Sequence, residues 1–265
     1  MPRATRSWIA CTIACTALLA SPSAAQAADN TPNPYVQSIP ATTITVSAAA
    51  SLTDVFPVIA GAFTKRYPQL KVTFNFAGSN ALVEQLRAGA PADVLATADE
   101  PSMWKAADAG LTTKPLLFAR NTMAIATPPG NPAQIQGLED LQKENVTTAV
   151  CAPAVPCGKR AAELFAMNSI DVKPVTEEVD VRAVMGKVMA DAVDAGIVYT
   201  TDARAAGKQV TTIAIPESKN VFSNYPIATV KESNNARAAK AFVDYVRYSS
   251  SAQRILRAWG FSKPW

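Results

Sequence analysis

The chain has 265 residues, a formal net charge of +4 at neutral pH and no histidine. The lack of histidine argues against most general-base catalysis and against many metal sites, which use imidazole. The basic residues form no cluster of the kind that binds nucleic acid, so we expect no nucleic-acid partner. The length allows one large domain or two modest ones.

The first 27 residues have the pattern of an export signal peptide. Arg3 and Arg6 give a basic start, an apolar run follows over 8–20, and residues 25–27 (Ala-Gln-Ala) form a small-residue cleavage site. No later apolar stretch is long enough to span a bilayer. We therefore expect an exported, soluble protein, in the periplasm or at the outer face of the cytoplasmic membrane. A lipid anchor at Cys15 is the competing interpretation.

Two cysteines remain after the signal peptide, and they lie close together in the sequence. Cys151 and Cys157 are six positions apart in the segment CAPAVPC. Export to an oxidising compartment favours a local disulfide between them. The alternative is a pair of small buried thiols.

Strand-like and helix-like segments alternate after a leader at 28–41 that is rich in Pro, Asn and Ser. Periodicity predicts strands at 43–47, 71–76, 93–96, 123–127, 147–151, 197–199, 213–215 and 227–230. It predicts helices at 52–66, 81–88, 101–109, 138–142, 158–168, 181–192, 235–248 and 252–259. Such alternation is typical of an α/β fold with a mostly parallel sheet.

The alternating pattern restarts near residue 122, which predicts two α/β lobes. The first lobe is expected to comprise 42–121 together with 226–265, because the C-terminal helices return to it. The second lobe is expected to comprise 122–225. Two crossovers, near 118–124 and 224–230, would join the lobes.

Two serines stand where a predicted strand gives way to an amphipathic helix. Ser51 begins the sequence Ser-Leu-Thr-Asp, which resembles a capping box with Asp54 reaching back, and Ser79 is open to the same interpretation as a simple cap. However, ligands of open α/β sheets bind at the carboxyl ends of strands. Two helix N-termini with hydroxyl groups at that edge would also form a seat for a small anion.

Three weaker signals lie at similar positions further along the chain. The turn at 155–159 could offer the backbone N–H of Cys157, and the next helix start could offer the N–H of Val181. Tyr199 ends a predicted strand, where its phenol could donate one hydrogen bond. Taken singly, the first two are ordinary turns and the third is an ordinary core tyrosine.

Taken together, six segments resemble the periplasmic molybdate-binding proteins of ABC transporters, from about residue 43 to the C-terminus. The segments are AAASLTDVF, FAGSNALVEQL, GAPADVLATAD, VPCGKRAAE, DVRAVM and GIVYTTDA. The resemblance implies a two-lobed periplasmic binding protein of type II. Each lobe would contain a mixed, mostly parallel sheet flanked by helices, and the ligand cleft would lie between the lobes.

The resemblance also implies the ligand and the residues that hold it. Molybdate or tungstate would be bound as an intact oxyanion, without direct coordination of the metal and without a cofactor. The implied ligand residues are Ser51, Ser79, Cys157, Val181 and Tyr199. Cys157 stands where the family often has alanine, which a contact through the backbone amide should tolerate.

The implied function is capture of molybdate, with tungstate also expected, and delivery to a membrane permease driven by an ATPase. The protein would act as a monomer and would not be an enzyme. One alternative is a carrier for another oxyanion such as sulfate. A serine-type hydrolase is a further alternative, because Ser102 and Lys105 fit the Ser-x-x-Lys pattern of penicillin-recognising enzymes, but the companion motifs of that family are missing.

Overall fold

The computed structural model describes residues 39–264, in which the strands form one nine-stranded mixed sheet. The strand order is β2-β1-β3-β9-β4-β7-β5-β6, and β8 pairs with the outer part of β4. The predicted signal peptide and Cys15 lie outside the described residues. No helix in the described part is long and apolar enough to cross a membrane.

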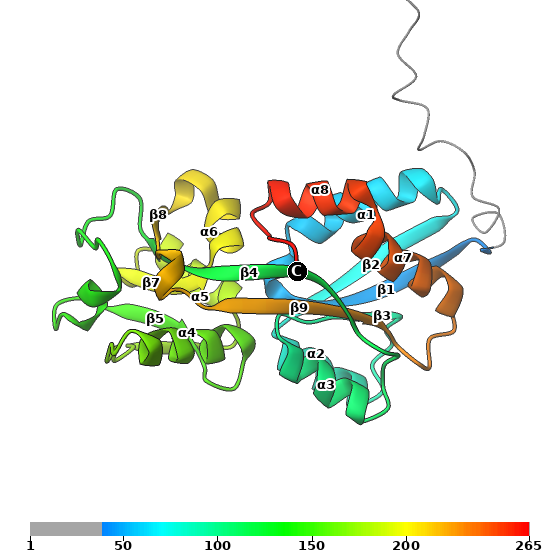
Figure 1. Ribbon diagram of the computed structural model, residues 1–265, viewed down its shortest axis with the longest axis horizontal. Helices are drawn as coiled ribbons and strands as arrows, with labels where there is room; N and C mark the ends of the chain where they lie inside the picture. The colour runs from blue at the N-terminus through cyan, green and yellow to red at the C-terminus, as the bar shows by residue number, and fades with distance from the viewer. Residues whose placement is uncertain (1–38, 265) are drawn as a thin grey trace, which may run out of the picture. The chain divides into compact units, whose positions relative to one another are not determined.

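The first lobe contains one end of the sheet and the helices that cover it. Its elements are β1 (Thr42–Ala49), the short 3₁₀ helix η1 (Ala50–Leu52), α1 (Val55–Arg66), β2 (Leu70–Ala77), α2 (Ser79–Arg87), β3 (Val94–Ala96), α3 (Glu100–Asp108), α7 (Ala236–Tyr248) and α8 (Ser250–Ala258). β1 pairs in parallel with both β2 and β3. Figure 1 shows α1, α7 and α8 on one face of these strands and α2 and α3 on the other.

The second lobe contains the other end of the sheet (Figure 1). Its elements are η2 (Leu138–Gln142), β5 (Thr148–Cys151), α4 (Pro156–Met167), β6 (Thr176–Glu178), α5 (Val181–Met189), β7 (Ala195–Tyr199), α6 (Thr200–Ala206), η3 (Gly207–Gln209), β8 (Thr211–Ala214) and η4 (Glu217–Lys219). β5 pairs in parallel with β6 and β7. Each lobe therefore repeats the strand-then-helix arrangement that the sequence pattern predicts.

Two long strands, β4 (Leu116–Thr127) and β9 (Phe222–Thr229), run between the lobes (Figure 1). They pair with each other in antiparallel fashion, and they contact β3 on one side and β7 on the other. These strands include most of the two segments expected to be crossovers. The boundary residues assigned to each lobe stay a prediction.

Buried aromatic side chains form much of the core of the first lobe. The Phe56 ring lies 5.8 Å from that of Phe118 and 6.1 Å from that of Phe242, centroid to centroid. The Phe63 ring contacts Phe242 and Tyr245 edge to face. Such pairs add to the hydrophobic gain from burying large rings, so α1 and α7 are fixed firmly on the sheet.

The α/β fold class predicted from the sequence is confirmed, and several element boundaries differ. The strands expected at 123–127 and 227–230 are the ends of longer strands, and α5 is shorter than expected because it ends at Met189. β6 and α6 have no counterpart among the predicted elements. The first helix begins at Val55, because residues 50–52 form a 3₁₀ turn instead.

Candidate functional site

A cavity of about 220 Å³, which includes some open solvent, lies where helix N-termini from both lobes meet. Its lining includes the residue before the helix or the first helical residue of η1, α2, α4, α5 and α6. The first N–H groups of a helix have no partner within the helix, and the dipole makes that end positive. Three of these elements, α2, α4 and α5, are helices of at least nine residues, and their N-termini favour an anionic ligand.

All five residues expected to hold a ligand line this one cavity: Ser51, Ser79, Cys157, Val181 and Tyr199. Ser51 and Ser79 come from the first lobe, and the other three come from the second lobe. The structure therefore brings the five together, with both lobes contributing.

Ser79 is the first residue of α2, and its hydroxyl does not cap that helix. Gly78 occupies the cap position, and Ser79 Oγ instead accepts a hydrogen bond of 3.0 Å from the backbone N–H of Ala98. The expected cap is therefore wrong. Because Oγ acts as the acceptor in this bond, the Ser79 hydrogen is available for a ligand in the cavity.

Ser51 lies in the 3₁₀ turn and also does not cap a helix, so the expected capping box is wrong. Its Oγ lies 2.8 Å from the hydroxyl of Tyr225. Asp54, expected to reach back to Ser51, instead forms an ion pair of 2.8 Å with Arg182 from α5 in the second lobe. The 3₁₀ turn delays the start of α1, which leaves the Ser51 side chain beside the cavity.

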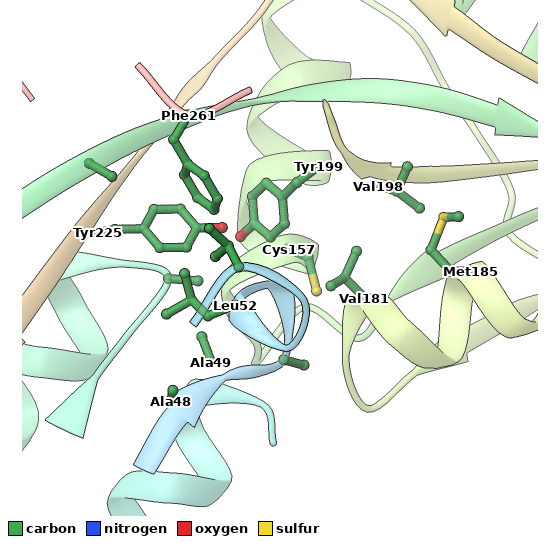
Figure 2. Close-up of a cluster of buried hydrophobic side chains, with 14 of the residues drawn as sticks. Ala48, Ala49, Leu52, Cys157, Val181, Met185, Val198, Tyr199, Tyr225 and Phe261 are labelled. Atoms are coloured by element: carbon green, nitrogen blue, oxygen red, sulfur yellow. The ribbon is translucent and has the colours of Figure 1, made fainter. Parts of the chain in front are cut away.

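Tyr199 has a buried hydroxyl without a hydrogen-bond partner among the described residues. Its side chain is 1% exposed, and its ring packs edge to face against Tyr225 at 5.9 Å. Figure 2 shows the hydroxyl ends of the two phenols directed toward the same region. Burial raises the pKa of the Tyr199 phenol, so the group keeps its proton at neutral pH. The nearby Ser223 hydroxyl opposes this rise in the Tyr199 pKa, but no described atom meets the phenol at hydrogen-bond geometry, so the phenol can donate to a ligand.

Cys157 and Cys151 form the disulfide that the sequence favoured, with a Cα–Cα distance of 5.6 Å. The bridge ties the end of β5 to the first turn of α4, so it holds the backbone at Cys157 in place beside the cavity. Gly158 allows this turn, because a Cβ atom there would lie 2.0 Å from the carbonyl oxygen of Ala152.

Val181 begins α5, and the residue before it carries a carboxylate that the helix itself uses. Asp180 Oδ1 accepts hydrogen bonds from the N–H groups of Arg182 and Ala183, at 2.9 and 3.0 Å. These bonds do not involve the N–H of Val181. The negative charge of Asp180 at the cavity wall is thus offset by the helix N-terminus that it caps.

The charged groups around the cavity pair with each other at its rim. Among the described residues, the cavity lining includes no lysine or arginine. Arg182 pairs with Asp54 as given above, and Lys159 of α4 pairs with Asp99 of the first lobe at 3.2 Å. The wall therefore offers mainly neutral donors, while the two ion pairs join the lobes beside it.

The Ser-x-x-Lys pattern does not form a catalytic pair in the structure. Ser102 is buried in the first turn of α3, and its backbone N–H donates to Asp99. Lys105 points to Glu84, with Nζ 2.7 Å from the carboxylate at an exposed position. Neither residue lines the cavity.

Three polar residues of the connecting strands also support the site, and sequence reasoning missed them. Tyr225 contacts Ser51, Asn121 donates to the Tyr225 hydroxyl at 3.3 Å, and Ser223 donates to the Ala98 carbonyl at 2.5 Å. All three are buried. In the sequence, these residues are polar side chains within strands. They interrupt the apolar pattern by which a buried strand is recognised, and no local motif marks them as site residues.

Comparison with known proteins shows the family to which the chain belongs. A model of bacterial extracellular solute-binding proteins matches residues 44–262. The molybdate-binding protein ModA of Mycobacterium tuberculosis strain H37Rv is 40% identical over 225 residues, which cover 84% of this chain and 86% of that protein.

Two solved structures share the fold. The periplasmic molybdate-binding protein of Azotobacter vinelandii has a TM-score of 0.74 at 18% identity, covering 84% of this chain and 100% of that one. The sulfate-binding protein SubI of Mycobacterium tuberculosis H37Rv has a TM-score of 0.73 at 21% identity, covering 84% and 87%. The chain belongs to the bacterial extracellular solute-binding protein family, as a relative of its molybdate-binding members.

Proposed function

We propose that the protein captures molybdate, and tungstate as well, in the cavity between its lobes. The observation that carries the proposal is the donor set of the cavity: the N-termini of α2, α4 and α5, two serine hydroxyls and the phenol of Tyr199. The relative at 40% identity, which is named for molybdate, supports the choice of ligand. The anion would accept hydrogen bonds from Ser51, Ser79, the backbone amides of Cys157 and Val181, and Tyr199.

A wall of neutral donors suits a small dianion that carries no proton. A hydrogen bond to a charged group contributes about 1.5 to 3 kcal/mol, so several together offset the cost of removing the ion from water. Molybdate, tungstate and sulfate can accept at every oxygen. Hydrogen phosphate carries a proton that needs an acceptor. The carboxylate among the described lining residues is Asp180, and its Oδ1 already accepts two backbone N–H groups of α5.

The biological role that we propose is delivery of the bound oxyanion to a membrane permease driven by an ATPase. The protein would be exported and act as a monomeric carrier without catalysing a reaction. The family of extracellular solute-binding proteins supports this role. The ion pairs that join the lobes at the rim are consistent with a ligand enclosed between them.

Titration calorimetry with molybdate, tungstate, sulfate and phosphate tests the ligand. We expect strong binding of the first two, weaker binding of sulfate and none of phosphate. Sulfate binding as tight as that of molybdate would favour the sulfate carrier instead.

The same assay tests the site through serine variants. Ser51→Ala and Ser79→Ala should each weaken molybdate binding by about 1.5 to 3 kcal/mol, because each removes one donor to a charged ligand. Ser218→Ala is the matched control, since Ser218 is exposed and does not line the cavity. Unchanged affinity in both site variants would contradict the assignment.

A further inference from the structure

A hydrogen-bonded chain runs from the cavity into the two connecting strands. Ser51 Oγ lies 2.8 Å from the hydroxyl of Tyr225. Asn121 Nδ2 donates to that hydroxyl at 3.3 Å and to Thr201 Oγ1 at 2.7 Å. The chain therefore links Ser51 in the first lobe to Thr201 of α6 in the second, through one residue on each connecting strand.

We propose that Tyr225, oriented by Asn121, makes the Ser51 hydroxyl an obligate hydrogen-bond donor to the bound anion. Tyr225 does not line the cavity and is fully buried, so it would act as a positioning residue and not as a ligand. The inference deepens the proposed function and rests on it.

The orientation of the Asn121 side chain follows from one fixed donor. The backbone N–H of Thr122 donates to Asn121 Oδ1 at 3.0 Å, and an N–H group can only donate. The other end of the Asn121 amide must then be the NH₂ group, which donates to the Tyr225 oxygen. Either hydroxyl of the Tyr225–Ser51 pair could donate by geometry alone. Under the proposal Tyr225 donates, because its oxygen already accepts from Asn121 and Ser51 Oγ is the acceptor that its buried hydroxyl contacts.

Once Ser51 Oγ accepts from Tyr225, its hydrogen must point elsewhere. Ser51 lines the cavity, so a ligand oxygen there is the acceptor that the geometry offers. Ser79 reaches the same state by a separate route, because its Oγ accepts from the backbone N–H of Ala98. Both serines thus direct their hydrogens to the ligand, which suits an anion that carries no proton.

The register of the connecting strands explains why these residues meet. Tyr225 on β9 lies opposite Ala119 on β4, and Asn121 is two residues further along β4. Residues two apart on a strand share a face, so Asn121 and Tyr225 are diagonal neighbours on one side of the ladder. Figure 2 shows the Tyr225 ring entering the cluster beside Leu52 and Tyr199.

A double-mutant cycle measured by calorimetry tests the proposal. Tyr225→Phe should weaken molybdate binding about three- to tenfold, the loss typical of one neutral hydrogen bond. The same change should weaken binding as much in a Ser79→Ala background and have no effect in a Ser51→Ala background.

Tyr245→Phe is the matched control, because it removes a hydroxyl from another largely buried tyrosine of the first lobe and should leave affinity unchanged. Asn121→Ala provides a second cycle if Tyr225→Phe fails to fold, as judged by thermal unfolding. Its effect should likewise vanish with Ser51→Ala.

Equal loss from Tyr225→Phe in the Ser51→Ala background would overturn the positioning role, as would unchanged molybdate affinity in the Tyr225→Phe variant itself. A wild-type protein that binds no molybdate would instead refute the proposed function.

Discussion

Asp202 carries a buried carboxylate that should make stability depend on pH. It lies in the first turn of α6, is 2% exposed, and neither oxygen has a hydrogen-bond partner among residues 39–264. Arg182 Nη1 is 3.8 Å away, but that guanidinium also pairs with Asp54. Burial raises the pKa of Asp202 from 3.8 to about 7; Arg182 opposes the rise, while Asp54 and Asp180 add to it.

The raised pKa of Asp202 determines whether stability rises or falls with pH. The folded protein holds the Asp202 proton more tightly than the unfolded chain, so the contribution to stability is fully present below about pH 4. It is lost as the pH rises to 7. With about 1.4 kcal/mol per pKa unit, the full loss is about 4 kcal/mol, and solvent entry or relaxation around the carboxylate would reduce it.

The substitution Asp202→Asn removes the charge and should remove this dependence. Relative to wild type, the free energy of unfolding of the variant should increase between pH 4 and pH 8 by about 1 to 4 kcal/mol. Urea unfolding without ligand at pH 4, 6 and 8 measures this difference. Asp171→Asn, at an exposed position, is the control. A difference between Asp202→Asn and wild type that is the same at every pH would refute the reasoning.

Two further predictions concern the backbone around the cavity. A Cβ atom at Gly78 would lie 2.9 Å from the carbonyl oxygen of Val179 in the other lobe, so Gly78→Ala should weaken molybdate binding about tenfold by calorimetry. Gly61→Ala should leave molybdate binding unchanged, because a Cβ atom there has open space around it. Equal losses of affinity in the Gly78→Ala and Gly61→Ala variants would contradict the steric argument. Replacing Cys151 and Cys157 by serine should lower the free energy of unfolding by about 2 kcal/mol, the value for such a short loop. Urea unfolding measures this difference in free energy. If a reductant left the urea midpoint of the wild-type protein unchanged, the result would count against the prediction.

Sequence patterns predicted most of the elements because the buried faces of strands and helices follow simple periods. The two connecting strands were predicted only in part. The part of β4 before residue 123 contains Arg120, Asn121 and Thr122, and the first half of β9 contains Ser223 and Asn224. Polar residues break the pattern of a buried strand, and here they form hydrogen bonds with each other and with neighbouring elements.

The ligand role of the five site residues stays a prediction, whereas their local roles can be compared with the structure. The resemblance to a family named five residues that the structure places around one cavity. Local pattern alone suggested that Ser51 and Ser79 cap helices, and both suggestions were wrong. The partners that replace the caps are Tyr225 and Ala98, which are distant in sequence, so a local motif could not reveal them.

The connecting strand β9 both joins the two lobes and supports the site residues. It is one of the two strands that span the lobes, and its residues Ser223 and Tyr225 hold the backbone and hydroxyl groups that orient both serines. Any bend of this strand that separates the lobes must also disturb the aim of those hydroxyls. Separation of the lobes and weakening of the hydrogen bonds to the bound ion would then occur together. A transporter that separates the lobes would not need a site of its own that outcompetes these hydrogen bonds.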